Sequence, residues 1–181
     1  MTLQAYDRGV LAVQRRAFDE AREQLASAGS DDRALLLLGQ LASNGDGEPV
    51  DPVRARRLYE RAAELGNGEG AHNLGVLYAT GRGVAQDFAV ALEWYRRSAE
   101  LGDVPARRMV GLMYATGQGV PVDEDEAERQ WRSAAAAGEV RALHDLGTLF
   151  AYHKSRLPEA DLLVRRQASQ SAAAQRQCGD V

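Results

Sequence analysis

The sequence predicts an all-α fold built from repeated helix pairs, and three observations support this prediction. The segment LGVLYATGRGV at residues 74–84 returns as VGLMYATGQGV at residues 110–120, with a fainter copy, LGQLASNGDGE, ahead of both. Single glycines recur every 36 residues, namely Gly39, Gly75, Gly111 and Gly147. Apolar residues within each copy follow the spacing of a helix with one buried face. Such a period is typical of repeat proteins, in which each repeat packs only against its neighbours.

The first complete repeat spans residues 30–66 and carries a start signal for its second helix. Asp51 is expected to be the N-cap, because its carboxylate can accept hydrogen bonds from the unpaired N–H groups of the first helical turn. Pro52 follows at the first helical position, where the missing N–H of proline does no harm. This repeat is therefore predicted to contain two helices joined by a glycine-containing turn.

The second repeat, residues 67–102, shows the pattern most clearly. Leu74 and Leu77 lie one helical turn apart on the apolar face of its first helix. Gly81 is suited to the left-handed conformation that follows a helix C-terminus. Asp87 is then expected to cap a second helix, because an acidic residue complements the positive end of the helix dipole.

The third repeat, residues 103–138, follows the same plan. Asp123 is the expected N-cap, and Glu126 stands three residues later. This spacing predicts a capping box, in which each of the two side chains accepts from the backbone N–H of the other residue.

A glycine inside each first helix needs an explanation, because it costs about 1 kcal/mol relative to alanine. The expected compensation is close packing between the two helices of a pair. Gly75 is predicted to face the small residue Ala91, so that the two backbones approach each other. Replacement of Gly75 by leucine is then expected to separate the helices.

This pattern resembles the Sel1-like repeat (SLR), a subclass of the tetratricopeptide repeat (TPR) superfamily. The matching residues of the second repeat are Leu74, Gly75, Leu77, Tyr78, Gly81, Gly83, Val84, Asp87, Ala91, Leu92, Trp94, Tyr95, Ala99 and Gly102. The resemblance is highly specific over residues 69–138 and good over residues 31–66. It implies a right-handed superhelical solenoid of about five antiparallel helix pairs.

Both ends of the chain depart from this pattern. Residues 1–29 are similar to a TPR-like helix pair without the glycine insert. Residues 139–181 predict a degenerate fourth repeat that serves as a C-terminal cap. In this repeat His153 and Ser155 replace the turn glycines, and Arg166 and Gln167 replace the aromatic pair. A frayed tail is expected from Gln175 onward.

Composition excludes several classes of partner. The net charge of −4 and the pI near 5.4 argue against nucleic-acid binding, which needs a basic surface. No apolar run approaches the roughly 20 residues of a membrane span, and Cys178 is the only cysteine. The N-terminus does not resemble a signal peptide, so the expected location is the cytoplasm, or the periplasm if a leader was removed. Lys154 is the only lysine, and this arginine bias is typical of a GC-rich, bacterial genome.

No pattern in the sequence predicts catalysis, a cofactor or a metal site. The Gly-x-Gly turns are expected to end helices, because phosphate-binding loops follow a strand. His72 and His144 are two repeats apart, and therefore about 20 Å apart, which is too far for one zinc ion. The acidic run at residues 123–126 lacks the spacing of a calcium loop. We therefore expect a protein that is not an enzyme.

The candidate partner-binding residues are those that the repeat leaves free in its first helices. The resemblance implies that they line a concave groove: Tyr6, Gln40, Asn44, His72, Val76, Arg108, Leu112, His144, Asp145 and Tyr152. The 36-residue spacing places His72, Arg108 and His144 in one row. Such a row favours an acidic peptide or a C-terminal carboxylate, and a solvated groove without a ligand is the alternative.

The function predicted on this basis is a non-catalytic adaptor or scaffold that binds a protein or peptide partner. Two alternatives stay open. The first is an immunity protein or a chaperone-like partner of a secreted bacterial effector. The second is a regulatory module that senses a small ligand in the groove. The identity of the partner and the oligomeric state do not follow from the sequence.

Overall fold

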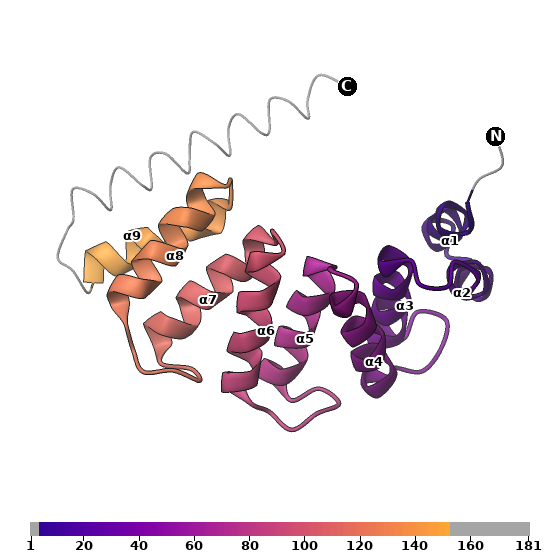
Figure 1. Cartoon of the computed structure of the whole chain (residues 1–181), viewed down its shortest axis with the longest axis horizontal. Coiled ribbons are helices and arrows are strands. Elements are labelled where there is room, and N and C mark those ends of the chain that lie inside the picture. Colours follow the sequence, from indigo (N-terminus) through magenta and orange to yellow (C-terminus); the bar gives the residue numbers. More distant parts are fainter. Residues whose placement is uncertain (1–3, 153–181) are drawn as a thin grey trace, which may run out of the picture. The chain divides into compact units, whose positions relative to one another are not determined.

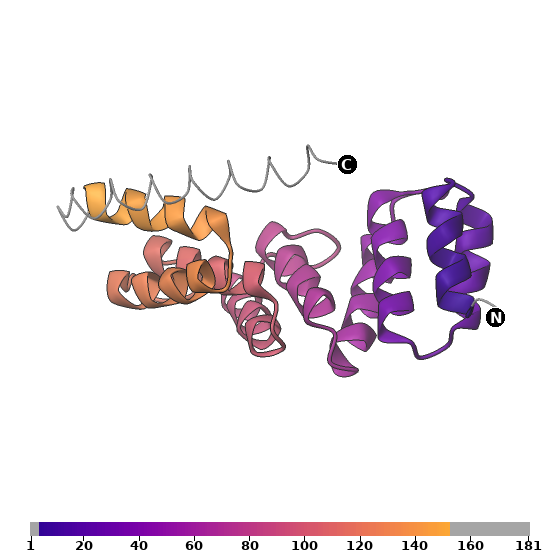
Figure 2. The same cartoon turned by 90° about the horizontal axis from the view of Figure 1, so that it is seen from above.

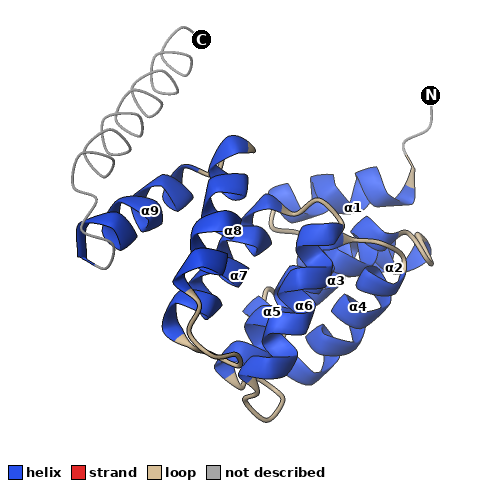
Figure 3. Ribbon diagram, turned by 60° about the vertical axis from the view of Figure 1, so that its left-hand side comes forward, coloured by secondary structure: helices blue, strands red, loops and turns tan. Residues whose placement is uncertain are grey.

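The computed structural model describes residues 4–152, and all regular structure in that range is helical (Figure 3). The helices, labelled in Figure 1, are α1 (Ala5–Gln14), α2 (Phe18–Ser27), α3 (Asp32–Asn44), α4 (Pro52–Glu64), α5 (Gly68–Thr80), α6 (Phe88–Glu100), α7 (Val104–Thr116), α8 (Glu124–Ala136) and α9 (Val140–Tyr152). The predicted all-α class is therefore confirmed. The predictions for His153, Ser155, Arg166, Gln167, Cys178 and the tail fall outside the described residues, and the handedness of the superhelix stays a prediction.

The chain divides into two compact units, unit 1 (residues 1–103) and unit 2 (residues 104–181). In unit 1, α1 packs against α2, α3 against α4 and α5 against α6, and each pair also packs against the next (Figures 1 and 2). In unit 2, α7 packs against α8, and α8 against α9. The predicted packing in consecutive pairs is confirmed within each unit.

The start of each second helix follows the predicted capping chemistry, with one exception. The side chain of Asp51 accepts from the N–H of Arg54, and Pro52 opens α4. The side chain of Asp123 likewise accepts from the N–H of Glu126 at 2.9 Å. The predicted capping box is nevertheless wrong in its second half. The N–H of Asp123 donates to the carbonyl of Tyr114 instead, and the Glu126 carboxylate accepts from side chains of its own helix.

The glycine turns end the first helices, as predicted. Gly81 follows α5 with a φ of +71°, and its N–H donates to the carbonyl of Leu77. Gly83 has a φ of +74°, and a Cβ atom there would lie 2.8 Å from Cβ of Pro52 in the preceding helix pair. A side chain would therefore be strained at Gly81 by its conformation, and at Gly83 by its conformation and by contact with Pro52.

In α3, α5 and α7 the glycine inside the helix packs against a ring, and the atoms nearest to Gly75 belong to Tyr95 instead of the predicted Ala91. A Cβ atom on Gly75 would lie 2.7 Å from two ring atoms of Tyr95. Gly39 faces Tyr59 in the same way, and Gly111 faces Trp131. Each glycine thus makes room for the largest buried side chain of its pair. The compensation for its low helix propensity is the burial of aromatic surface.

Candidate functional site

Unit 1 carries a groove of about 470 Å³, called the unit 1 groove below. Its walls come from α1, from α3, from the first turn of α5, and from the turns that precede α5 and α7. The residues that line it are Tyr6, Arg33, Leu36, Leu37, Gln40, Asn67, Gly68, Glu69, Leu101, Gly102 and Asp103. Two of them, Tyr6 and Gln40, belong to the predicted partner-binding set.

Internal hydrogen bonds fix the amide side chains of this groove. The Gln40 side chain donates from Nε2 to Oε1 of Glu69 at 2.8 Å, which joins α3 to α5. The Asn67 side chain donates to Asp32 at 2.7 Å and accepts from the N–H of Gly70 at 2.8 Å. These hydrogen bonds within the protein position the two amide groups of the groove wall.

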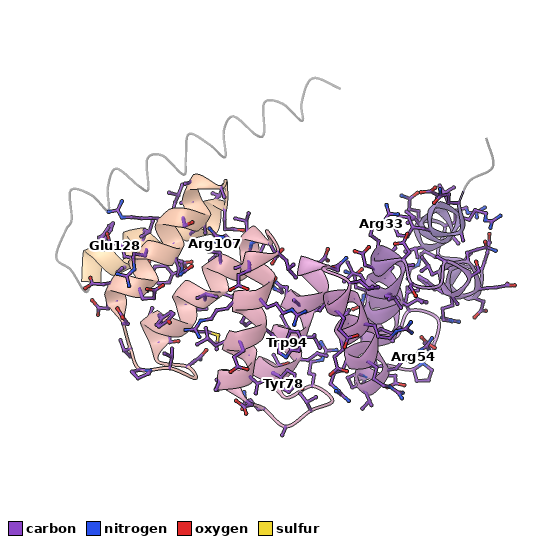
Figure 4. The ribbon with its side chains drawn as sticks, viewed as in Figure 1. Arg33, Arg54, Tyr78, Trp94, Arg107 and Glu128 are labelled. Atoms are coloured by element: carbon purple, nitrogen blue, oxygen red, sulfur yellow. The ribbon has the colours of Figure 1, made fainter. Side chains whose placement is uncertain are left out.

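Arg33 is neutralised within the protein. Its Nε and Nη2 atoms donate to the two carboxylate oxygens of Asp31, at 3.2 and 2.9 Å. This bonding lowers the pKa of Asp31 and raises the pKa of Arg33. The side chain of Arg33 is labelled in Figure 4. Its guanidinium lies 4.2 Å from the ring centre of Tyr6 on α1. The side chain is thus held by a carboxylate and an aromatic ring of its own unit.

His72 is also engaged by its own unit. Its Nδ1 atom lies 2.8 Å from Oδ2 of Asp103, and its ring meets that of Tyr95 edge-on at 5.4 Å. The same Asp103 oxygen accepts from the hydroxyl of Ser98 at 3.1 Å. Ser98 is fully buried and also donates to the carbonyl of Gly68. Because the carboxylate stands between the serine and the histidine, this trio lacks the order needed to activate a nucleophile.

Unit 2 carries a smaller hollow of about 320 Å³, called the unit 2 cleft below. Its residues come from α7, α8 and α9, and the surface that they expose to it is mainly apolar. They are Leu112, Ala115, Thr116, Glu124, Trp131, His144, Asp145, Thr148 and Leu149. Three of them, Leu112, His144 and Asp145, belong to the predicted set.

The second predicted cation, Arg108, forms an ion pair across the first helices of unit 2. Its Nε atom lies 2.5 Å from Oδ2 of Asp145, and its Nη2 atom lies 3.3 Å from Oδ1. The carbonyl of Arg108 accepts from the indole N–H of Trp131 at 3.0 Å. Arg108 therefore joins α7 to α9 and α8. Of the three predicted cationic positions, only His144 is exposed.

Asn44 and Val76 line neither hollow, and the prediction for Tyr152 falls outside the described side chains. Asn44 is exposed at the end of α3, where it donates to Asp46. Val76 is half-buried on α5 and does not line the unit 1 groove. Tyr152 is the last residue of α9, and its side chain lies outside the described part of the structure.

The sequence prediction missed the turns between helix pairs, which supply Asn67 and Asp103 to the unit 1 groove. The sequence of the repeat does contain a pattern that indicates these turns. Asp31, Asn67, Asp103 and Glu139 occupy equivalent positions, 36 residues apart, ahead of successive first helices. A polar residue at this position predicts a helix cap, and its place ahead of a first helix also brings Asn67 and Asp103 to the unit 1 groove.

Within residues 4–152 no cluster of three or more His, Cys, Asp or Glu side chains is suited to a metal ion. Within the same range no helix combines the length and the apolar character required to cross a bilayer.

Comparison with known proteins identifies the repeat. The Sel1 repeat family matches three consecutive segments, residues 32–67, 68–103 and 104–139. A search of curated proteins gave no significant match. Among solved structures, a Sel1 repeat protein from Oxalobacter formigenes has 26% identity and a TM-score of 0.84, over 93% of this chain and 69% of its own.

Two other solved structures are informative. A protective antigen of uropathogenic Escherichia coli with an SLR fold has 28% identity and a TM-score of 0.81, over 92% of this chain and 38% of its own. An immunity protein from Pseudomonas aeruginosa has 26% identity and a TM-score of 0.56, over 77% of this chain and 53% of its own. The chain thus spans only about half or less of these two proteins.

Proposed function

Because the chain belongs to the Sel1 repeat family, we propose that it is a non-catalytic adaptor that binds a protein or peptide partner through its first helices. The observation that carries this proposal is the unit 1 groove, which is lined by side chains of first helices and of the turns ahead of them. Its lining includes the aliphatic side chains of Leu36, Leu37 and Leu101 and the amide side chains of Gln40 and Asn67. This mixture suits an extended peptide, which presents both side chains and backbone polar groups.

The internal hydrogen bonds of the groove favour binding. Gln40 and Asn67 are already held by Glu69 and Asp32, so little side-chain freedom is lost when a partner docks. Burial of the Ser98 hydroxyl, which donates to a backbone carbonyl, supports a structural role for the one described serine–aspartate–histidine grouping. These observations favour recognition over chemistry.

A narrower second candidate is an immunity protein that neutralises a secreted effector. The structure that favours it is the immunity protein from Pseudomonas aeruginosa, which has 26% identity and covers 77% of this chain. In that case the captured partner would be a bacterial toxin, and co-expression of this chain would protect cells from it.

Affinity capture from a native lysate tests the adaptor proposal. The baits are the wild-type chain, Gln40→Arg in the unit 1 groove, Thr148→Arg in the unit 2 cleft, and Glu93→Arg as a control on the exposed face of α6. We expect either Gln40→Arg or Thr148→Arg to reduce recovery of the partner about tenfold, because a long charged side chain fills the groove or the cleft in which it lies. The control should recover the partner as the wild type does.

The pattern of losses locates the interface. Loss with Gln40→Arg alone places it in unit 1, and loss with Thr148→Arg alone places it in unit 2. Equal recovery by all four baits would remove both hollows from consideration. Recovery of no protein, combined with a rise in melting temperature upon addition of a metabolite, would instead support the small-ligand alternative.

A further inference from the structure

We propose that the unit 1 groove receives a basic segment of the partner, with an arginine or lysine side chain held against Glu69 and Asp103. This inference rests on the proposed binding function and adds the chemistry of the partner. It also reverses the preference for an acidic peptide that the sequence suggests.

The charges that line the groove lead to this conclusion. Two carboxylates, Glu69 and Asp103, and one guanidinium, Arg33, line its walls. The guanidinium is bonded through two nitrogens to both oxygens of Asp31, so its charge is already compensated. Asp103 is bonded as well, to His72, which does not line the groove. Two carboxylates and one guanidinium still leave the lining with a net negative charge, and Glu69 is the more exposed of the two carboxylates.

The geometry of Glu69 suits a cationic ligand. Its side chain is on the exposed first turn of α5, and the amide of Gln40 holds one of its oxygens at 2.8 Å. A carboxylate offers about four acceptor sites on two oxygens, so it can accept further N–H groups from a ligand. Charge-assisted hydrogen bonds of this kind are stronger than neutral ones, and a guanidinium can form two at once.

Apolar residues beside these carboxylates complete the site. Leu36 and Leu37 line the groove on α3, and Leu101, which is 41% exposed, lines it from the turn after α6. Lysine and arginine have aliphatic stems that pack on such surfaces while the charged end reaches a polar partner. An acidic side chain has a shorter stem, and its charge would repel Glu69 and Asp103.

Selection from a random peptide library displayed on phage tests the inference directly. With the wild-type full chain as bait, we expect the selected peptides to be enriched in arginine or lysine at one position. The dissociation constant of a selected peptide is then measured by fluorescence anisotropy for the wild type, Glu69→Gln, Glu69→Lys and Glu93→Lys. We expect about tenfold weaker binding with Glu69→Gln, because one charge-assisted hydrogen bond is lost. Glu69→Lys should weaken binding further, and Glu93→Lys, outside the groove, should not change it.

Added salt gives an independent check. It should weaken binding of the selected peptide to the wild type, because screening weakens attraction between exposed charges. The melting temperatures of the three variants, measured by circular dichroism, confirm that each is folded. Selected peptides that are acidic or lack a basic residue would overturn this inference and leave the adaptor proposal intact. A library that yields no binding peptide would count against both.

Discussion

Replacement of Gly75 by leucine is expected to lower the free energy of unfolding of unit 1 by about 3 kcal/mol, which is the upper part of the range for overpacked cores. A Cβ atom alone would lie 2.7 Å from two ring atoms of Tyr95, and the ring is only 1% exposed. Because the ring is almost fully buried, it can move aside only by displacing the side chains around it. Thermal unfolding of the full chain, followed by circular dichroism at 222 nm as a conventional helix signal, measures the effect.

Gly68→Ala is the matched control in the same helix. A Cβ atom there would lie 3.4 Å from the nearest side-chain atoms, which is an ordinary contact distance. A second test combines Gly75→Ala with Tyr95→Ala. Once the ring is absent, alanine at position 75 should stabilise the helix by up to about 1 kcal/mol instead of destabilising it. An unchanged melting temperature in Gly75→Leu would show that the glycine is not needed to make room for the ring of Tyr95.

The period of the sequence was sufficient to predict the helix pairs but not the contact inside each pair. Glycines every 36 residues, together with Asp51, Asp87 and Asp123 at helix starts, predict where helices begin and end. Contact between two helices also depends on how each is rotated about its axis. A glycine at every thirty-sixth position can pack either against a small residue or against a large ring of the facing helix, so its spacing does not distinguish the two. The sequence interpretation chose Ala91, whereas the structure places Tyr95 on Gly75.

The candidate site shows a second limit of predictions made from the repeat period. Equivalent positions in successive repeats predict equivalent locations, but their partners differ. His72 bonds to Asp103 in the following turn, whereas Arg108, at the equivalent position, bonds to Asp145 on the next first helix. Glu139, the equivalent of Asp103, bonds to Arg141 instead. These ion pairs involve residue types that change from repeat to repeat, so the period does not predict them.

Raising the pH is expected to destabilise unit 1 through the same ring that packs on Gly75. Burial raises the pKa of Tyr95 to about 12, from an ordinary value of 10.0. Below about pH 10 the phenol is protonated in both the folded and the unfolded chain. The contribution of the buried ring to the free energy of unfolding is then fully present. Between about pH 10 and 12 the unfolded chain releases this proton more readily than the folded chain. The free energy of unfolding should therefore fall by about 3 kcal/mol over this window.

Urea unfolding at several pH values measures this loss, and Tyr95→Phe is the control. Phenylalanine keeps the ring over Gly75 but has no phenol to ionise, so stability near neutral pH should change little while the alkaline loss becomes smaller. A residual loss is expected in this variant, because burial also raises the pKa of Tyr59 at the equivalent position on α4. Trp131 occupies that position in unit 2 and does not ionise. If Tyr95→Phe retained the full alkaline loss, burial of this ring would not be its cause, and the packing assigned to Gly75 would lose its independent support.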